Sequence, residues 1–365
     1  MSTQVTQAPT MAQSVWLVAQ REIGSKFRSK AFLISTIILF LGALALVIWG
    51  GIQAGATNDT RVAVTTDAQQ YVQEVPGLEV TDAADQAEAE SLVTSGDVDA
   101  AIVGDPDSPV GFAVIADSSA PTSLILSLAQ VPPVHLLNPD TTDEALRYFV
   151  AIGFGIVFLL AASLFGGTIA QSVVEEKQTR VVELLISAIP TRTLLAGKVI
   201  GNTILAMAQI LILAAIALVG LALTGQAAVL AGLGAPIAWF AVFFLFGFVL
   251  LASLFAAAAA MVSRQEDIGS TTTPLTMLVM APYFLVIFFN DNPVVLAVMS
   301  YVPFSAPVAM PVRVFLGDVQ WWEPLLSLVI LIATCVAAIL VGARIYENSL
   351  LRMGGRVKLR EALAS

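Results

Sequence analysis

Long apolar stretches constrain the fold of this 365-residue chain more than any other feature. A helix needs about 20 apolar residues to cross the hydrocarbon core of a bilayer. Six stretches come close to or exceed that length: residues 31–52, 148–171, 198–224, 237–262, 273–289 and 325–346. The fifth is the shortest, and Pro274 and Pro282 predict that it is interrupted. Only 12% of the residues are charged, against about 25% in soluble proteins. We therefore expect an α-helical polytopic membrane protein with six transmembrane helices.

Residues 53–147, between the first two apolar stretches, have a different character. They hold 16 of the 27 acidic residues and only two basic ones. Alternating apolar residues predict strands at 61–65, 98–103 and 111–115, and helices are expected at 82–95 and 123–130. Strands that alternate with helices predict an inserted α/β domain. His135, the only histidine, cannot build a histidine-rich metal site, so neither a metal nor a cofactor is expected.

The N-terminal region is expected to begin with a disordered segment, residues 1–13. Residues 14–30 then place Trp16, Ala19, Ile23 and Phe27 at helical spacing, with basic residues between them. That pattern predicts an amphipathic helix at the membrane interface. An ordinary basic flank to the first transmembrane helix is the alternative.

Charged residues are unusually dense in the segment between the second and third apolar stretches, VEEKQTRVVELLISAIPTRTLLAGKVIG. Ionisable groups are costly in hydrocarbon, so this segment is expected outside it or at its edge. One helix is predicted within residues 173–190. Glu176 and Arg180, four residues apart, would pair on one face with Glu183 next to them, and Pro190 would end the helix. Such a helix is suited to a partner's groove, and a solvated loop helix is the alternative.

Two further segments do not fit a simple transmembrane helix. Residues 290–323 are too broken by proline to cross the membrane and too apolar for a free loop, which predicts a re-entrant or interfacial segment. Trp321 and Trp322 at its end are typical of the headgroup level. Residues 347–365 read as a basic tail.

The basic residues predict the orientation. With both termini in the cytoplasm, 14 of the 17 Lys and Arg residues lie on the cytoplasmic side, as the positive-inside rule expects. Only Arg61, Arg147 and Arg313 lie outside. The α/β domain at 53–147 and the segment at 290–323 are then extracytoplasmic, and the charged segment and the basic tail face the cytoplasm of a multi-pass cell-membrane protein.

Several chemistries find no support in the sequence. No GxxxxGK[ST] loop is present, because Gly197-Lys198 is followed by Val199, so the chain has no site of this kind for nucleotide phosphates. Residues 175–180 spell EExxxR, a signature of intramembrane CAAX-type proteases, but that chemistry needs histidines. The net charge of −10 disfavours nucleic acid as a partner.

The order of these features resembles the permease subunits of ABC type-2 exporters, particularly the branch with sodium-efflux permeases. The resemblance covers the interfacial helix, the large external domain, the EEK-containing segment and the YVPFSAP stretch at 301–307. It implies no enzymatic activity in this chain, a separate ABC ATPase subunit, and a homodimer or heterodimer of permeases in the bilayer. It also implies contact with the ATPase through the charged segment, for which the candidates are Glu175, Glu176, Arg180, Glu183 and Arg192. The cargo could be sodium, a drug, a peptide or a lipid.

Polar side chains within the spans are the candidates for a translocation path: Asn202, Gln209 and Thr276. Hydrogen bonding between helices is the alternative role for them. Two other functions stay open. One is a membrane-anchored sensor or scaffold with a ligand-binding external domain. The other is an ATP-independent ion transporter, which the absence of a central carboxylate or arginine pair in the spans disfavours.

Overall fold

The computed structural model describes residues 10–55, 60–72, 75, 77–106, 108–117, 124–125, 128, 144–179, 181–225, 227–352 and 357–364. The chain forms two compact units, a helical one within residues 1–51 and 141–365 and a smaller one within residues 52–140. Each is described by itself. The predicted helix at 123–130 and His135 lie largely or wholly outside the described residues.

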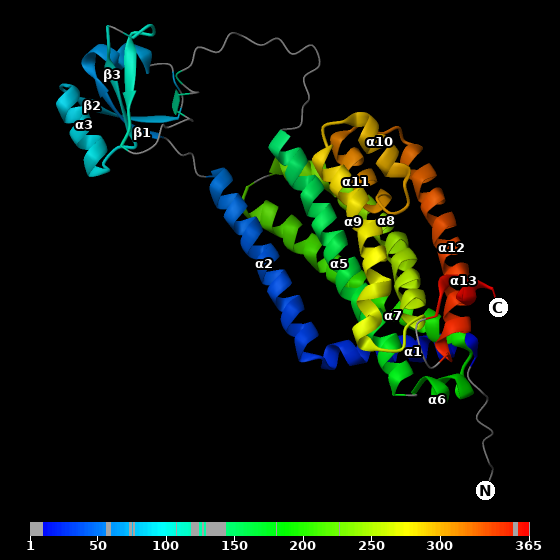
Figure 1. Ribbon diagram of the computed structural model, residues 1–365. Helices are drawn as coiled ribbons and strands as arrows, with labels where there is room; N and C mark the ends of the chain where they lie inside the picture. The colour runs from blue at the N-terminus through cyan, green and yellow to red at the C-terminus, as the bar shows by residue number, and fades with distance from the viewer. Residues whose placement is uncertain are drawn as a thin grey trace. The chain divides into compact units, whose positions relative to one another are not determined.

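Among its described residues, the helical unit contains six helices that are long and apolar enough to cross a membrane, as the sequence predicts (Figure 1). They are α2 (Lys30–Gly55), α5 (Glu144–Gln178), α7 (Thr191–Leu223), α8 (Ala227–Ala260), α9 (Ile268–Phe288) and α12 (Glu323–Leu350). Shorter helices complete the unit: α1 (Met11–Arg28), α6 (Val181–Ala188), α10 (Pro293–Tyr301), α11 (Ala306–Leu316) and α13 (Leu359–Leu363). Figure 1 shows α1 and α6 at one end of the unit and α10 and α11 at the other.

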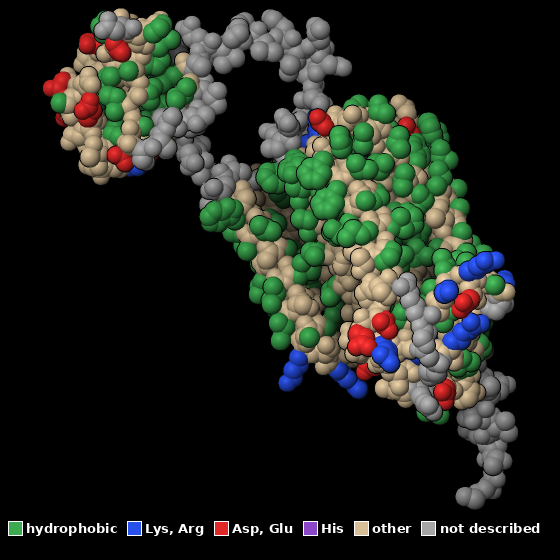
Figure 2. Space-filling view, in the orientation of Figure 1, with side chains coloured by type: hydrophobic (Ala, Val, Ile, Leu, Met, Phe, Trp, Pro, Cys, Tyr) green, Lys and Arg blue, Asp and Glu red, His purple; other side chains and the backbone are tan. Residues whose placement is uncertain are grey.

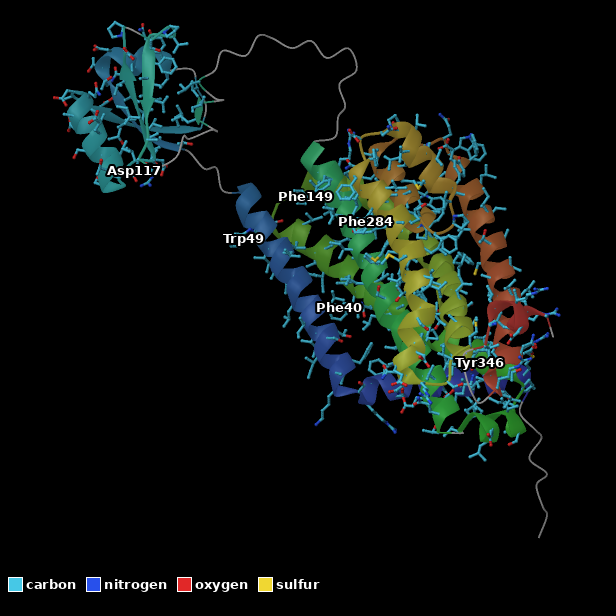
Figure 3. All side chains as sticks on the ribbon, in the orientation of Figure 1. Phe40, Trp49, Asp117, Phe149, Phe284 and Tyr346 are labelled. Carbon is cyan, nitrogen blue, oxygen red and sulfur yellow. The ribbon has the colours of Figure 1, made fainter. Side chains whose placement is uncertain are left out.

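Helix α8 is the core of this unit. Two thirds of its membrane-spanning window (67%) is buried, more than in any of the other five spans. It is apolar around its whole circumference, as expected of a helix that neighbours enclose on all sides. Its aromatic rings pack against α5, where Phe244 meets Phe158 and Phe248 meets Phe165 edge to face. By contrast only 6% of the α2 window is buried, and many of its large apolar side chains are exposed. Phe40 and Trp49 lie on this helix (Figure 3).

The structure bears on two expectations about the proline-containing segments, and it corrects the first. Helix α9 is not interrupted but runs through both Pro274 and Pro282, which membrane helices tolerate because neighbouring groups satisfy the freed backbone. Residues 290–323 form the short helices α10 and α11, and residues 306–313 of α11 are buried. The YVPFSAP stretch therefore joins two short helices and enters the core.

The two chain ends of the helical unit are more ordered than the sequence suggests. Helix α1 begins at Met11, because Thr10 and Gln13 form a capping box that satisfies its first backbone donors. At the other end the predicted basic tail is partly packed. Val357 donates its backbone N–H to Met261, and the side-chain amide of Asn348 donates to the carbonyl of Ala362, which is fully buried.

The smaller unit contains a four-stranded sheet of order β2-β1-β3-β4. Its strands are β1 (Thr60–Thr65), β2 (Leu78–Ala83), β3 (Ala100–Gly104) and β4 (Phe112–Ile115). β1 pairs in parallel with β2 and β3, whereas β4 is antiparallel to β3. Alternation along β1 sends Val62 and Val64 to one buried layer and Ala63 to another. Helix α3 (Gln86–Ser95) covers the second layer, starting at its N-cap Asp85 and ending at Gly96 in the left-handed conformation.

Candidate functional site

A cluster of four charged side chains joins α1, α5 and α7 at the end of the bundle that carries α6. Lys198 is its centre and has no exposed side-chain surface. Its ammonium nitrogen lies 2.8 Å from Glu22 Oε1 and 3.0 Å from Glu176 Oε2, and it donates to Ser172 Oγ at 2.6 Å. Arg21 donates to Glu176 and lies 3.4 Å from Glu22. Two positive and two negative groups thus pair with one another, and of the four only Arg21 is largely exposed, at 41% of its side-chain surface.

Two glycines allow this cluster to form. Gly197 and Gly201, one turn apart on α7, face α1 so closely that a Cβ at Gly201 would lie 2.9 Å from the carbonyl oxygen of Ala19. A Cβ at Gly197 would lie 2.4 Å from the Cβ atom of Val18. Such small residues bring helix backbones together, as in other membrane helix pairs. The close approach carries the short side chain of Glu22 to Lys198.

The face of α1 that is buried against the bundle carries its small residues and Glu22. Its buried residues are Ser14, Val18, Ala19 and Glu22, whereas Trp16 is 48% exposed and Phe27 is 58% exposed. The large apolar side chains therefore face outward, where a membrane interface would receive them, and the glycine surface of α7 takes the small ones. Glu22 is buried because Lys198 supplies its counter-charge.

The protonation of Glu22 follows from these surroundings. Burial acts to raise its pKa, but the charge and hydrogen bond of Lys198, together with Arg21, outweigh burial and hold the pKa below its ordinary value of 4.5. The carboxylate is therefore ionised at neutral pH. Since the pKa is lowered by folding, the pairing stabilises the fold above about pH 4.5 and is lost as the pH falls through the carboxyl range.

Lys177, next to Glu176 in the sequence, is buried at a different place. Its ammonium group donates to the carbonyl oxygens of Ala260 at 2.8 Å and Ser349 at 2.9 Å. These carbonyls belong to the last turns of α8 and α12, respectively. The last carbonyls of a helix have no partner within it and carry its negative dipole end. One lysine thus caps two helices.

The predicted single helix across residues 173–190 is wrong. The structure ends α5 at Gln178 and begins α6 at Val181, and Thr179 folds its hydroxyl back onto the carbonyl of Glu175. Figure 1 shows α6 lying across the end of the bundle instead of continuing α5. The change of direction buries Val182 and packs Leu185 and Ile186 against the core, which a straight helix would not do.

The five candidate coupling residues are not equivalent in the structure. Glu175 and Glu183 are exposed. Glu176 is bound by Arg21 and Lys198 and not by a residue on its own helix. Arg192 is exposed and forms an ion pair with Glu347 through two hydrogen bonds, with nitrogen–oxygen distances of 2.7 and 3.1 Å. Arg180 lies outside the described residues.

The three candidate path residues differ in their hydrogen bonds, and Asn202 also accepts a bond from Thr168 of α5 at 3.5 Å. Asn202 is fully buried and donates to the carbonyl of Lys198 on its own helix, and Thr276 donates to the carbonyl of Thr272 on α9. Gln209 is 5% exposed, and its side-chain oxygen has no hydrogen-bond partner among the described residues. No hydrogen bond joins these three side chains to one another within the described part of the chain. The described residues also contain no group of three His, Cys, Asp or Glu side chains that could hold a metal ion.

The surface of the helical unit is strongly divided. In Figure 2 apolar side chains cover the flank of the unit, and most of the visible Lys and Arg side chains gather at the end with α1, α6 and α13.

A family model described as ABC-2 family transporter protein matches residues 30–344, which is most of the chain. The chain belongs to the ABC-2 transporter family. This multi-pass membrane protein is thus of the permease type.

Two relatives of this ABC-2 protein carry no functional description. It is 28% identical over 259 residues to the uncharacterised protein YhaP of Bacillus subtilis strain 168, covering 67% of this chain and 62% of the relative. It is 27% identical over 224 residues to the uncharacterised protein MJ1024 of Methanocaldococcus jannaschii, covering 60% and 54%, respectively. The matches thus span a little over half of each relative's length. No solved structure matches the chain. The sodium-efflux branch stays a prediction, because neither relative's description names a cargo.

Sequence reasoning missed most of the charge cluster. It singled out Glu176, but counted Arg21, Lys177 and Lys198 only among the basic residues on the cytoplasmic side and gave Glu22 no role. One signal was present in the sequence: Glu22 stands among basic residues of α1, and Lys198 lies between two glycines at helical spacing. Spacing of this kind indicates a close helix contact.

Proposed function

We propose that this ABC-2 permease couples ATP hydrolysis by a separate ABC ATPase to the efflux of a substrate. The observation that carries the proposal is the open face of α6. Leu184 is 73% exposed and Val181 is 38% exposed, while Val182 on the opposite side is fully buried. A helix that buries one apolar side and leaves a second one open is suited to a partner's groove. The exposed Glu183 beside Leu184 adds a charge that can set the register of docking.

The five candidate residues then divide into two roles. Glu175 and Glu183, both exposed, would contact the ATPase directly with Leu184. Glu176 and Arg192, each paired within the chain, would act by positioning the docking helix. Arg180 stays a candidate for direct contact.

We further propose that both termini and α6 lie in the cytoplasm and that the unit with the β-sheet is extracytoplasmic. The support is the distribution of Lys and Arg, of which 14 of 17 fall on the proposed cytoplasmic side. The α10–α11 segment would be on the outer side. The open apolar flank of α2 would face lipid or a second permease in a homodimer or heterodimer.

Cysteine labelling tests this orientation. The substitutions Ser91→Cys, on exposed α3, and Gln178→Cys, at the exposed end of α5, would be made separately in a Cys335→Ala background. An impermeant thiol reagent should label the first in intact cells and the second only after the membrane is opened. The unmodified background serves as the control, because the buried Cys335 is the only native cysteine. The reverse labelling pattern would contradict the orientation and the position of α6 with it.

Docking through α6 predicts a separation between folding and partner binding. Leu184→Asp changes a side chain that is mostly exposed, so the membrane level of the permease should stay near that of the wild type. At the centre of an interface the same change should cost about 2 kcal/mol or more, roughly a 30-fold loss of affinity. Copurification of the ATPase that accompanies the wild-type chain measures this loss. Leu359→Asp, on α13 and 55% exposed, is the matched control. Undiminished copurification by a Leu184→Asp, Glu183→Lys double variant would refute docking through α6.

A further inference from the structure

Two adjacent residues on the last turn of α5 reach four different helices. Glu176 contacts Arg21 of α1 and Lys198 of α7, whereas Lys177 contacts the ends of α8 and α12. Their neighbour Glu175 is exposed and Gln178 ends the helix. Consecutive helical residues point about 100° apart, which explains how one turn serves two sides of the bundle.

The contacts on both sides involve buried groups, apart from Arg21, which is 41% exposed. On the first, the side chain of Glu176 is 12% exposed, that of Glu22 is 5% exposed and that of Lys198 is fully enclosed. On the second, Lys177 is 1% exposed and is held by two carbonyls. Buried ionic and charge-assisted hydrogen bonds hold a definite geometry, because any displacement leaves a charge without a partner.

We infer that Glu176 and Lys177 are positioning residues that clamp the end of α5 to α1 and α7 on one side and to α8 and α12 on the other. The inference rests on the proposed function in one respect: α6 is taken to be the helix that the ATPase contacts and displaces. Only three residues, Gln178, Thr179 and Arg180, separate the clamp from α6. A displacement of α6 therefore reaches the four clamped helices together through the end of α5.

The side toward α12 also has spare hydrogen-bonding capacity. The hydroxyls of Tyr346 and Ser349 are buried, and neither has a hydrogen-bond partner among the described residues. Tyr346 lies at the end of α12 near α13 (Figure 3). Buried polar groups normally find partners. These two hydroxyls offer α12 alternative bonds when its end shifts, which is what a contact that repacks during a transport cycle requires.

Distance measurements between spin labels test the clamp. Three exposed positions take cysteines in the Cys335→Ala background: Gln178 at the end of α5, Gln20 on α1 and Gln265 just after α8. The pair 178–20 reports the first side of the clamp, and the pair 178–265 reports the second. Each pair is measured in the purified chain and in its complex with the copurified ATPase, with and without a non-hydrolysable ATP analogue.

Each side of the clamp should fail separately. Glu176→Gln should broaden the 178–20 distribution and leave the 178–265 distribution narrow. Lys177→Met should do the opposite, and Lys177→Arg should restore a narrow 178–265 distribution. Glu175→Gln and Lys358→Met, which change exposed residues of the same types, should alter neither. A merely structural role predicts that each variant broadens both pairs together.

Two results would overturn the inference: narrow distributions in both variants, or joint broadening of both pairs in each of them. Failure of the proposed function looks different. If α6 does not dock an ATPase, no ATPase copurifies and nucleotide changes no distance, but the separate broadening in the purified chain persists.

Discussion

Replacing Lys198 with methionine is expected to destabilise the helical unit more than any other single charge removal in this chain. Lys198 is fully enclosed and lies within 3.0 Å of both Glu22 and Glu176. Its removal leaves two buried carboxylates whose remaining ion-pair partner, Arg21, is 41% exposed. Breaking a buried ion pair by removing one partner costs about 3–5 kcal/mol. Thermal unfolding of the purified protein in detergent, together with its membrane level, measures the effect.

Two comparisons make this prediction specific. Adding Glu22→Gln should recover much of the loss, because a buried pair can often be replaced by neutral groups at little cost. Arg192→Met removes a pair in which Arg192 is 68% exposed, and should change stability by about 1 kcal/mol or less. A Lys198→Met protein as stable as wild type would show that the cluster does not hold α1 to α7.

The pH dependence of the same variant has a defined sign. In the wild type the pKa of Glu22 is lowered, so its pairing contributes above about pH 4.5 and is lost below. In Lys198→Met the carboxylate loses its main counter-charge and takes up a proton more readily. The stability difference between the two proteins should therefore shrink as the pH falls through the carboxyl range.

Replacing Gly201 with leucine is the second substitution with a large expected effect. Even a Cβ at this position would lie 2.9 Å from the carbonyl oxygen of Ala19 and 3.1 Å from Cβ of Glu22. The backbone of α1 must therefore move away. Overpacking costs about 1–3 kcal/mol, and the shift would also separate Glu22 from Lys198. A cysteine at Ser14, which is 6% exposed in the wild type, should become reactive toward a thiol reagent.

The matched control is Gly167→Leu on α5. A Cβ at Gly167 would meet no atom within 4 Å, so leucine there should leave the protein as stable as wild type or slightly more stable, as helix propensity favours. Continued protection of the cysteine at position 14 in Gly201→Leu would argue against close packing of α1 on α7. Gly201→Ala should give an intermediate result.

The apolar helices could be read directly from the sequence. Each span is set by the hydrophobicity of its own residues, and the bilayer fixes the length that is needed. In the part of the chain that the structure describes there are accordingly six such helices, from α2 to α12. The effect of the prolines and the packing of the C-terminal tail were harder to predict. The prolines of α9 did not interrupt it. The tail packs because Met261 accepts a hydrogen bond from Val357 and Asn348 donates one to Ala362.

The candidate site was predicted only in outline. The sequence identified the charged segment as important, and the structure places it at the end of the bundle with α1 and α6. The expected pairing of Glu176 with Arg180 rested on spacing along one helix. Glu176 instead contacts Arg21 and Lys198, which are distant in sequence. Spacing along a chain describes only neighbours on the same helix.

The sequence by itself determined the compartment, the number of spans and the family, because these depend on local hydrophobicity and on motifs that can be read along the chain. The tertiary structure alone decided which charged residues are buried. Lys177 and Lys198 count as two ordinary basic residues in a topology rule, yet one caps α8 and α12 and the other binds Glu22. Burial of a charge depends on partners from other helices, since only a counter-charge or a carbonyl brought close by packing offsets the cost of losing water.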